Sequence, residues 1–353
     1  AKALLEPNAD LDSAFVKFEL ELRRTGQRNR FYDITGWSLP YTYRVDAYTV
    51  STMPAALAPY AAPTRTITAP ARAQYAYAFA PGSETSTRLL AALLTDSIRV
   101  WYAPYGFTSR GQSFPNGAFV VRVQTNRADL HELITKHAQS IGVPVASIAS
   151  AGVDSGTDLG SNSVVPITRP RVALLGGTPV NGTPFGFAWY ALDQRIGYAS
   201  SIIDANYLAG GDLAAFTTII MPSVQGGALE RLIGDAGRQR LVEWVRNGGV
   251  LITMEGASAW IAQERVGLVR TRVKRDSVRA DSTGGAPLPG SLPGVIARAT
   301  VDSLSPLTFG VLQREIPVFA TGGTVFTIPR DLSAGEALIR FAPVDRVKLS
   351  GYY

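Results

Sequence analysis

The chain has 353 residues, 46% hydrophobic and 18% charged, with a formal net charge of +6. This length and composition predict about two or three globular domains with large cores. The absence of cysteine excludes disulfides, cysteine–zinc sites and thiol catalysis. No apolar run reaches the roughly 18–20 residues that a membrane-spanning helix needs. The basic residues are mostly arginines scattered along the chain, whereas nucleic-acid-binding proteins gather their charge on one face. We therefore expect neither a membrane span nor a nucleic-acid partner.

Residues 1–50 are predicted to be a tail that cannot fold alone. Asp10 or Asp12 can cap a helix that runs to about Arg24. The aromatic stretch FYDITGWSLPY at 31–41 follows without a clear period. Such a tail must pack on a missing or neighbouring domain. Residues 51–72, rich in alanine, proline and threonine, predict an extended linker. Because the chain begins without methionine, we expect it to be a processed or excised piece.

Residues 73–150 alternate between strand and helix patterns. Strands are predicted at 75–79, 98–103, 118–123 and 144–150, and helices at 85–94 and 128–141. The order β-α-β-β-α-β is that of a split βαβ domain, an α+β arrangement. Residues 151–169, rich in glycine, serine, aspartate and asparagine, predict a second linker.

Residues 170–353 are predicted to form one doubly wound domain of the flavodoxin-like kind. Short apolar strands separated by helices indicate a parallel sheet covered on both faces. The strands are expected at 172–175, 200–204, 216–221 and 250–254. A basic loop insertion is predicted at about 265–300, with short strands after it at 318–320, 324–328 and 337–341. A doubly wound domain normally ends with a helix, so we also expect truncation at this end.

The segment 247–260, NGGVLITMEGASAW, is the strongest candidate for a functional element. It predicts a strand, a sharp turn at Glu255-Gly256 and a helix, the unit on which α/β enzymes mount a nucleophile. Ser258 does not fit G-x-S-x-G, because Trp260 stands where the second glycine is needed. No histidine lies in the second half of the chain, so a Ser-His-Asp triad cannot form there. Glu255 is expected at the sheet edge where ligands bind, either as a ligand-binding group or as a helix cap.

A second candidate is the glycine pair after the first strand of this domain. Gly176-Gly177 could hold a phosphate. However, G-x-G-x-x-G is not matched, and Pro179 and Pro184 delay the following helix. We predict no catalytic residue. The predicted ligand-binding residues are Gly176, Gly177, Ser223, Glu255 and Ser258.

The two histidines do not predict a metal site. His131-Glu132 begins like H-E-x-x-H, but the second histidine, His137, comes six residues later. A helix turns about 100° per residue, so these two side chains point apart. H-x-x-E also fails, because Ile134 and Ser140 occupy the glutamate positions. We expect no cofactor and no metal in this chain.

Two stretches resemble one protein family. FYDITGWSLPY resembles the YDVTAWSLP segment that follows the catalytic domain of large bacterial zinc carboxypeptidases of the M14 class. Residues 170–353 resemble the class I glutamine amidotransferase-like domain downstream in those proteins, and SLSPLTFG at 303–310 is similar to its HPLxFG stretch. The family's zinc ligands, an H-x-x-E pair and a later histidine, lie upstream of WSLP and are absent here. Met254-Glu255-Gly256 replaces the amidotransferase C-x-G, and Ser305 replaces the histidine of HPL.

The resemblance implies a non-catalytic accessory part of a secreted or periplasmic metallopeptidase. Its role would be scaffolding or substrate recognition during proteolysis by the parent protein. The implied partners are the catalytic peptidase domain, which carries the zinc, and a peptide substrate. The alternative is an independent ligand-binding module with a degenerate amidotransferase-like pocket. An active amidase is least favoured, because the chain offers neither a nucleophile nor a base.

Overall fold

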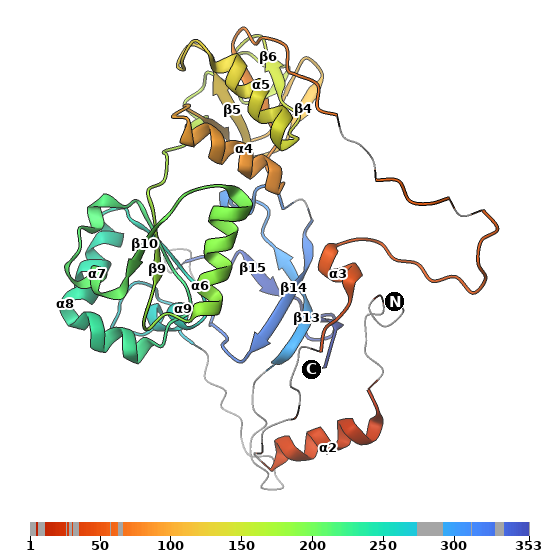
Figure 1. The fold of residues 1–353 in the computed structure, drawn as a ribbon, viewed down its shortest axis with the longest axis vertical. Helices are drawn as coiled ribbons and strands as arrows, with labels where there is room; N and C mark the ends of the chain where they lie inside the picture. The colour runs from red at the N-terminus through yellow and green to blue at the C-terminus, as the bar shows by residue number, and fades with distance from the viewer. Residues whose placement is uncertain are drawn as a thin grey trace. The chain divides into compact units, whose positions relative to one another are not determined.

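The computed structural model describes residues 5, 11–25, 27, 30, 35–56, 58–62, 66–273, 292–311, 313–328 and 335–352. They form a mixed α/β structure with antiparallel sheets and one parallel four-stranded sheet (Figure 1). The chain divides into two compact units. The larger comprises Ala62–Arg270 and Leu304–Leu312, and the smaller comprises Ala1–Ala61, Thr271–Ser303 and Gln313–Tyr353.

The first part of the larger unit is an antiparallel sheet with two helices on one face. The strand order is β6-β1-β5-β2-β8, with every neighbouring pair antiparallel. The strands are β1 (Ala76–Phe79), β2 (Trp101–Ala103), β5 (Ala118–Arg122), β6 (Ala146–Ile148) and β8 (Val165–Pro166). The helices are α4 (Glu84–Thr95) and α5 (Leu130–Ile141). Ser83 caps α4 by accepting a 3.0 Å hydrogen bond from the Ser86 amide, as an N-cap serine should.

The second part of the larger unit is the parallel sheet, in the order β10-β9-β11-β12. Its strands are β9 (Val172–Gly176), β10 (Ser201–Asp204), β11 (Thr218–Met221) and β12 (Val250–Thr253). The helices are α6 (Gly182–Trp189), which continues as the π-helix η1 (Tyr190–Ile196), then α7 (Ala205–Gly210), the 3₁₀ turn η2 (Leu213–Ala215), α8 (Gly226–Arg246) and α9 (Gly256–Ile261). Figure 1 shows α6 on one side of β9 and β10, and α7 and α8 on the other.

One buried cluster of the larger unit draws residues from both the five-stranded antiparallel sheet and the parallel sheet. Alternate residues of the parallel strands, among them Leu175 and Ile219, pack against α7, α8 and α9. The opposite face, with Leu174 and Ile220, belongs to the same buried cluster as Leu89 of α4. The predicted domains 73–150 and 170–353 therefore share buried apolar residues, because Leu89 of α4 lies in the same cluster as Leu174 and Ile220 of the parallel sheet.

Residues 151–169 are packed against the antiparallel sheet, which differs from the linker predicted from their composition. Leu159 and Val164 are buried. The Arg122 guanidinium donates a 2.6 Å hydrogen bond to the Leu159 carbonyl oxygen. Within this segment, β7 (Ser155–Gly156) pairs with β3 (Phe107–Ser109), which also pairs with β4 (Gln112–Phe114). The few apolar residues have no regular spacing, so the sequence pattern does not reveal their burial.

The smaller unit contains a second large antiparallel sheet, built by β13 (Leu292–Val301), β14 (Glu315–Gly322), β15 (Ile339–Phe341) and β16 (Lys348–Ser350). Its helices are α2 (Ser13–Arg24) and α3 (Leu39–Tyr43). The prediction that residues 170–353 form a single doubly wound domain is therefore wrong for 292–353. Strand β13 lies within the predicted insertion, of which residues 274–291 are outside the described residues. Antiparallel pairing partners cannot be read from strand length and apolar content alone.

The end of the aromatic stretch at 31–41 packs on this second sheet. The amides of Thr35 and Gly36 donate to the Gly294 carbonyl oxygen at 2.7 and 3.0 Å. The Thr35 hydroxyl oxygen accepts from the Tyr352 amide at 2.9 Å. The sequence predicts that this tail packs on a missing or neighbouring domain, and its described end bonds to the neighbouring strand β13 and to Tyr352. Residues 31–34 are outside the described residues.

The segment Leu304–Leu312 belongs to the larger unit, although its neighbours in sequence do not. Gly310 and Gly82 have positive φ and approach so closely that a Cβ on either would overlap the other's backbone. A Cβ on Gly117 would lie 2.8 Å from the Phe309 Cβ. The stretch predicted to resemble HPLxFG thus packs on turns of the antiparallel sheet, where only glycine fits.

A bidentate ion pair joins the two parts of the larger unit. Arg195, in η1, donates through Nε to Glu84 Oε1 at 3.0 Å and through Nη2 to Glu84 Oε2. The hydrogen bond from Arg195 lowers the pKa of the Glu84 carboxyl below 4.5, against an opposing effect of desolvation. Glu84 also stands in the first turn of α4, where the helix dipole favours a negative charge.

This pair predicts a pH-dependent contribution to stability. Because the folded-state pKa of Glu84 is lowered, the contribution is present above its unfolded pKa and is lost as the pH falls through the folded value. Arg195→Gln should therefore lower the melting temperature at about pH 7 and make progressively less difference as the pH falls toward about 2. Thermal denaturation followed by circular dichroism across this range measures the difference. Arg231→Gln, an exposed arginine on α8, is the control. An equal effect of Arg195→Gln at both pH values would contradict the prediction.

Candidate functional site

The turn between β12 and α9 holds Glu255 in a backbone conformation that side chains rarely adopt. Its φ is 45° and its ψ is −113°. These angles lie near those of the first central residue of a type II′ turn, a position dominated by glycine. A non-glycine residue held in such a region costs about 1–3 kcal/mol, and such strain clusters at functional sites. The strained residue therefore marks this turn as the candidate site.

In the structure, Glu255 and not Met254 has the strained backbone at this turn. From the sequence, Met254 stands in place of the nucleophile. In the structure, Met254 is partly buried against the core shared by the two sheets, whereas Glu255 is strained and exposed. The missed signal is the position of Glu255 directly before Gly256, the first residue of α9. The turn thus presents a carboxylate and not a thioether.

Glu255 does not cap the helix that follows it. Its side chain makes no capping hydrogen bond to α9. Asp204, at the end of the neighbouring β10, does cap its helix, by accepting from the amides of Asn206 and Tyr207 at 2.8 and 3.2 Å. Of the two roles predicted for Glu255, the geometry favours ligand binding over capping, since a capping carboxylate would accept from the first-turn amides.

Ser223 connects the turn to the neighbouring loops. The Gly256 amide donates to the Ser223 hydroxyl oxygen at 3.3 Å, and the Asn181 amide donates to the Ser223 carbonyl oxygen at 2.9 Å. A Cβ on Gly256 would overlap the Val224 carbonyl oxygen, so the loop after β11 and the turn after β12 approach closely only because Gly256 is glycine. Three loops at the carboxyl edge of the sheet therefore meet at Ser223.

The other predicted ligand-binding residues lie at the same edge of the sheet but are structural in character. Gly176 ends β9 inside the core, where a Cβ would lie 2.9 Å from the Phe185 ring. Gly177 follows with a φ of 68° and accepts from the Val180 amide at 2.7 Å. The Ser258 hydroxyl pairs with the Thr253 hydroxyl at 3.0 Å, which fastens α9 to the end of β12. Ser223 and Glu255 remain as the polar side chains of the site.

Trp260 anchors the turn from beneath. Its side chain is fully buried among the residues that pack under α8 and α9. Its indole N–H donates to Glu230 Oε1 at 3.1 Å, and Glu230 Oε2 is paired with Arg265 at 2.6 Å. Because Trp260 is held both by apolar packing and by its hydrogen bond, it fixes the position of α9. The strain at Glu255 can persist only in such fixed surroundings.

Both histidines have structural partners in the antiparallel part of the fold. His131 Nδ1 lies 2.8 Å from the Tyr77 hydroxyl, and His137 Nε2 lies 2.8 Å from Asp96 Oδ2. Within the described residues, no group of three or more His, Asp or Glu side chains is placed to hold a metal ion. No helix in the described part of the chain is long and apolar enough to cross a membrane.

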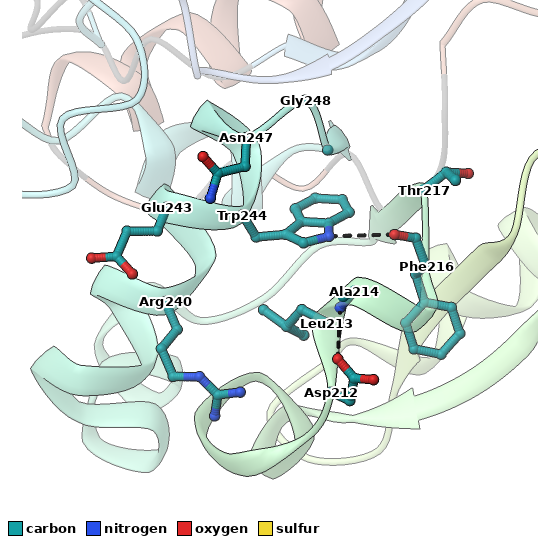
Figure 2. Close-up of a pocket in the computed structure, with 11 residues that line it drawn as sticks. Asp212, Leu213, Ala214, Phe216, Thr217, Arg240, Glu243, Trp244, Asn247 and Gly248 are labelled. Carbon is teal, nitrogen blue, oxygen red and sulfur yellow. Dashed lines mark hydrogen bonds between the residues drawn. The ribbon is translucent and has the colours of Figure 1, made fainter.

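A hollow of about 490 Å³ lies at the opposite, amino-terminal edge of the sheet, between α8 and the segment before β11 (Figure 2). Its polar groups are largely used within the protein. The Arg240 guanidinium donates to the carbonyl oxygens of Ala209 and Gly211, and the Trp244 indole N–H donates to that of Phe216 at 3.4 Å. Figure 2 shows this last bond and the Asp212 side chain accepting from the Ala214 amide. This hollow is therefore a gap between packed elements, and we do not assign a ligand to it.

Comparison of the chain with protein-family models, curated proteins and solved structures found no match. The function is therefore inferred from the chemistry of the turn at Glu255 and from the sequence resemblance.

Proposed function

We propose that this chain is a non-catalytic recognition module that binds a ligand at the carboxyl edge of its parallel sheet. The observation that carries the proposal is the strained backbone of Glu255, which holds an exposed carboxylate where a catalytic turn would hold its nucleophile. A carboxylate only accepts hydrogen bonds and attracts positive charge. The site therefore suits a ligand that brings a cationic or hydrogen-bond-donating group.

The fold supports this position for a ligand site. The order β10-β9-β11-β12 corresponds to strands 2-1-3-4 of a flavodoxin-like sheet, in which ligands bind outside the carboxyl ends of the strands. Similarly, the order β6-β1-β5-β2 with α4 and α5 supports a split βαβ arrangement for the first part of the larger unit. An exposed ion pair contributes only about 0.2–1 kcal/mol, so recognition through Glu255 should be weak and sensitive to salt.

We further propose that the module is an accessory part of a secreted or periplasmic zinc metallocarboxypeptidase of bacterial origin. The support is the resemblance of residues 31–41 to the segment that follows the M14 catalytic domain. The partner would be that catalytic domain, with its zinc, and the ligand would be a part of the peptide substrate. The competing proposal is an independent ligand-binding module. An upstream H-x-x-E followed by a later histidine in the same reading frame would favour the peptidase parent, and a reading frame without them would favour the independent module.

Ligand recognition at Glu255 is tested by titrating the whole chain with short peptides that carry lysine or arginine, and with their acetylated or neutral counterparts. We expect the cationic peptides to bind and Glu255→Gln to weaken their binding by up to about fivefold, the loss expected for one exposed ion pair. Glu243→Gln, a charge-matched change at an exposed glutamate of α8, is the control. Nuclear magnetic resonance titration detects weak binding and reports whether the signals of Ser223 and Gly256 move. Cationic peptides that bind Glu255→Gln as tightly as the wild type, or no binding of any cationic peptide, would contradict the proposal.

A further inference from the structure

A second hollow, of about 840 Å³, opens at the amino-terminal edge of the parallel sheet. At this edge the chain enters β9, β10 and β11, whereas the turn at Glu255 lies at the opposite, carboxyl-terminal edge. Its volume is within the range of small-molecule sites, roughly 300–1,000 Å³. Three segments form most of its wall: 169–172, 197–201 and 215–216, with Thr95 of α4 completing it.

The charged residues of this hollow are both arginines. Arg169 and Arg171 line it, and no aspartate or glutamate does. Arg171 is held in place, because its Nε donates to the Ala215 carbonyl oxygen at 2.6 Å and its Nη2 to that of Ala214 at 3.2 Å. Its Nη1 makes no hydrogen bond within the described residues. Arg169 is exposed and has no hydrogen-bond or ion-pair partner among the residues that the structure describes. The hollow thus offers uncompensated positive charge.

The rest of the wall combines hydroxyl groups with apolar surface. Ser200 and Ser201 line the hollow beside the arginines. Val172 and Tyr198 are buried and supply the apolar part. The Tyr198 hydroxyl donates to the Pro170 carbonyl oxygen, which ties the loop before β10 to the residue between the two arginines. The Arg171 guanidinium and the Pro170 backbone are therefore held by the fold, and the exposed Arg169 side chain stands beside them.

We infer that this hollow binds a small organic phosphate, with its phosphate group at Arg169 and Arg171 and its organic part over Tyr198. Guanidinium groups match the oxygens of phosphate in a bidentate manner, and charge-assisted hydrogen bonds are the strongest kind. Two guanidinium groups balance a phosphate dianion better than a singly charged carboxylate. The serine hydroxyls add donors for the remaining phosphate oxygens.

The test compares phenyl phosphate, benzoate and inorganic phosphate as probes in calorimetric titrations of the whole chain. We expect phenyl phosphate to bind at least about tenfold more tightly than benzoate, and all binding to weaken with added salt. Arg169→Gln should reduce the affinity for phenyl phosphate by about tenfold or more, because it removes a charged hydrogen-bond donor. Arg231→Gln, another exposed arginine of the same unit, should leave it unchanged.

Two further variants separate the possible causes. Arg169→Lys keeps the charge but not the planar fork, so its affinity should fall between those of the wild type and Arg169→Gln. Glu255→Gln should leave phosphate binding unchanged, since Glu255 is at the other edge of the sheet. Arg169 has no partner to lose, so its variants should melt at the wild-type temperature. The inference is overturned if phenyl phosphate does not bind, if benzoate binds equally well, or if Arg169→Gln and Arg231→Gln have the same effect.

Discussion

Replacing Glu255 with glycine is expected to raise the free energy of unfolding by up to about 2.5 kcal/mol. The backbone strain of roughly 1–3 kcal/mol is relieved, and only about 0.5–1 kcal/mol is lost to the greater freedom of glycine in the unfolded chain. The angles of Glu255, φ 45° and ψ −113°, are readily accessible to glycine. Urea denaturation of the two proteins measures the difference. The same change should weaken the binding of cationic peptides at the turn, because the carboxylate is gone.

Glu255→Gln is the matched control for the strain. It removes the charge but keeps a side chain on the strained backbone, so the free energy of unfolding should stay close to that of the wild type. A stabilisation by glycine without one by glutamine would show that the backbone, and not the charge, is the source of the cost. If Glu255→Gly were destabilising, the conformation of Glu255 would not be strained and the argument for a functional turn would lose its basis.

Replacing Trp260 with alanine is expected to lower the free energy of unfolding by about 3–5 kcal/mol, the usual cost of removing a large aromatic side chain from a core. Trp260 is fully buried, and its loss leaves a cavity between α8 and α9. The Glu230 oxygen that accepts from the indole also loses this partner, although Glu230 stays paired with Arg265. Chemical denaturation at constant pH gives the value.

Trp260→Phe separates the packing of the indole from its hydrogen bond. Phenylalanine fills most of the volume, so this variant should lose clearly less stability than Trp260→Ala. Because α9 is anchored by Trp260, the alanine variant should also loosen the turn, which amide hydrogen exchange at Gly256 and Ala257 would detect. Equal losses for the alanine and phenylalanine variants would assign the stabilisation to the hydrogen bond and contradict the packing argument.

The two proposed sites use opposite edges of one parallel sheet. The turn at Glu255 offers negative charge at the carboxyl ends of the strands, whereas the hollow at Arg169 offers positive charge at their amino ends. The first position follows from the general rule for parallel sheets. The second position does not follow from this rule. It arises because the loops before β9 and β10 leave a space that two arginines line and no aspartate or glutamate lines. Ligands of opposite charge at the two sites would thus distinguish them.

Much of the local structure could be predicted from the sequence by itself. Most strands and helices of residues 73–150 and 172–254 follow from apolar periodicity and from caps such as Ser83, which act between residues close in the chain, whereas the short elements β3, β4 and α7 do not. The candidate turn was also predictable, because a strand, a glycine and a helix in succession leave few alternatives. The sequence also indicates the turn at Glu255-Gly256 and aligns Met254 with the nucleophile, but it does not reveal the strained angles of Glu255, since backbone angles at a turn depend on what holds the turn.

Only the tertiary structure decided the features that join distant residues. The pairing of Thr35 with Gly294, the close approach of Gly82 and Gly310, and the burial of Leu159 have no local signal, because each depends on a surface formed elsewhere in the chain. The separation of residues 292–353 from the parallel sheet has the same cause. The conformation of Glu255 likewise requires Ser223 and Trp260, which hold both sides of its turn. Sequence periodicity determined the elements, and long-range packing determined which residues meet.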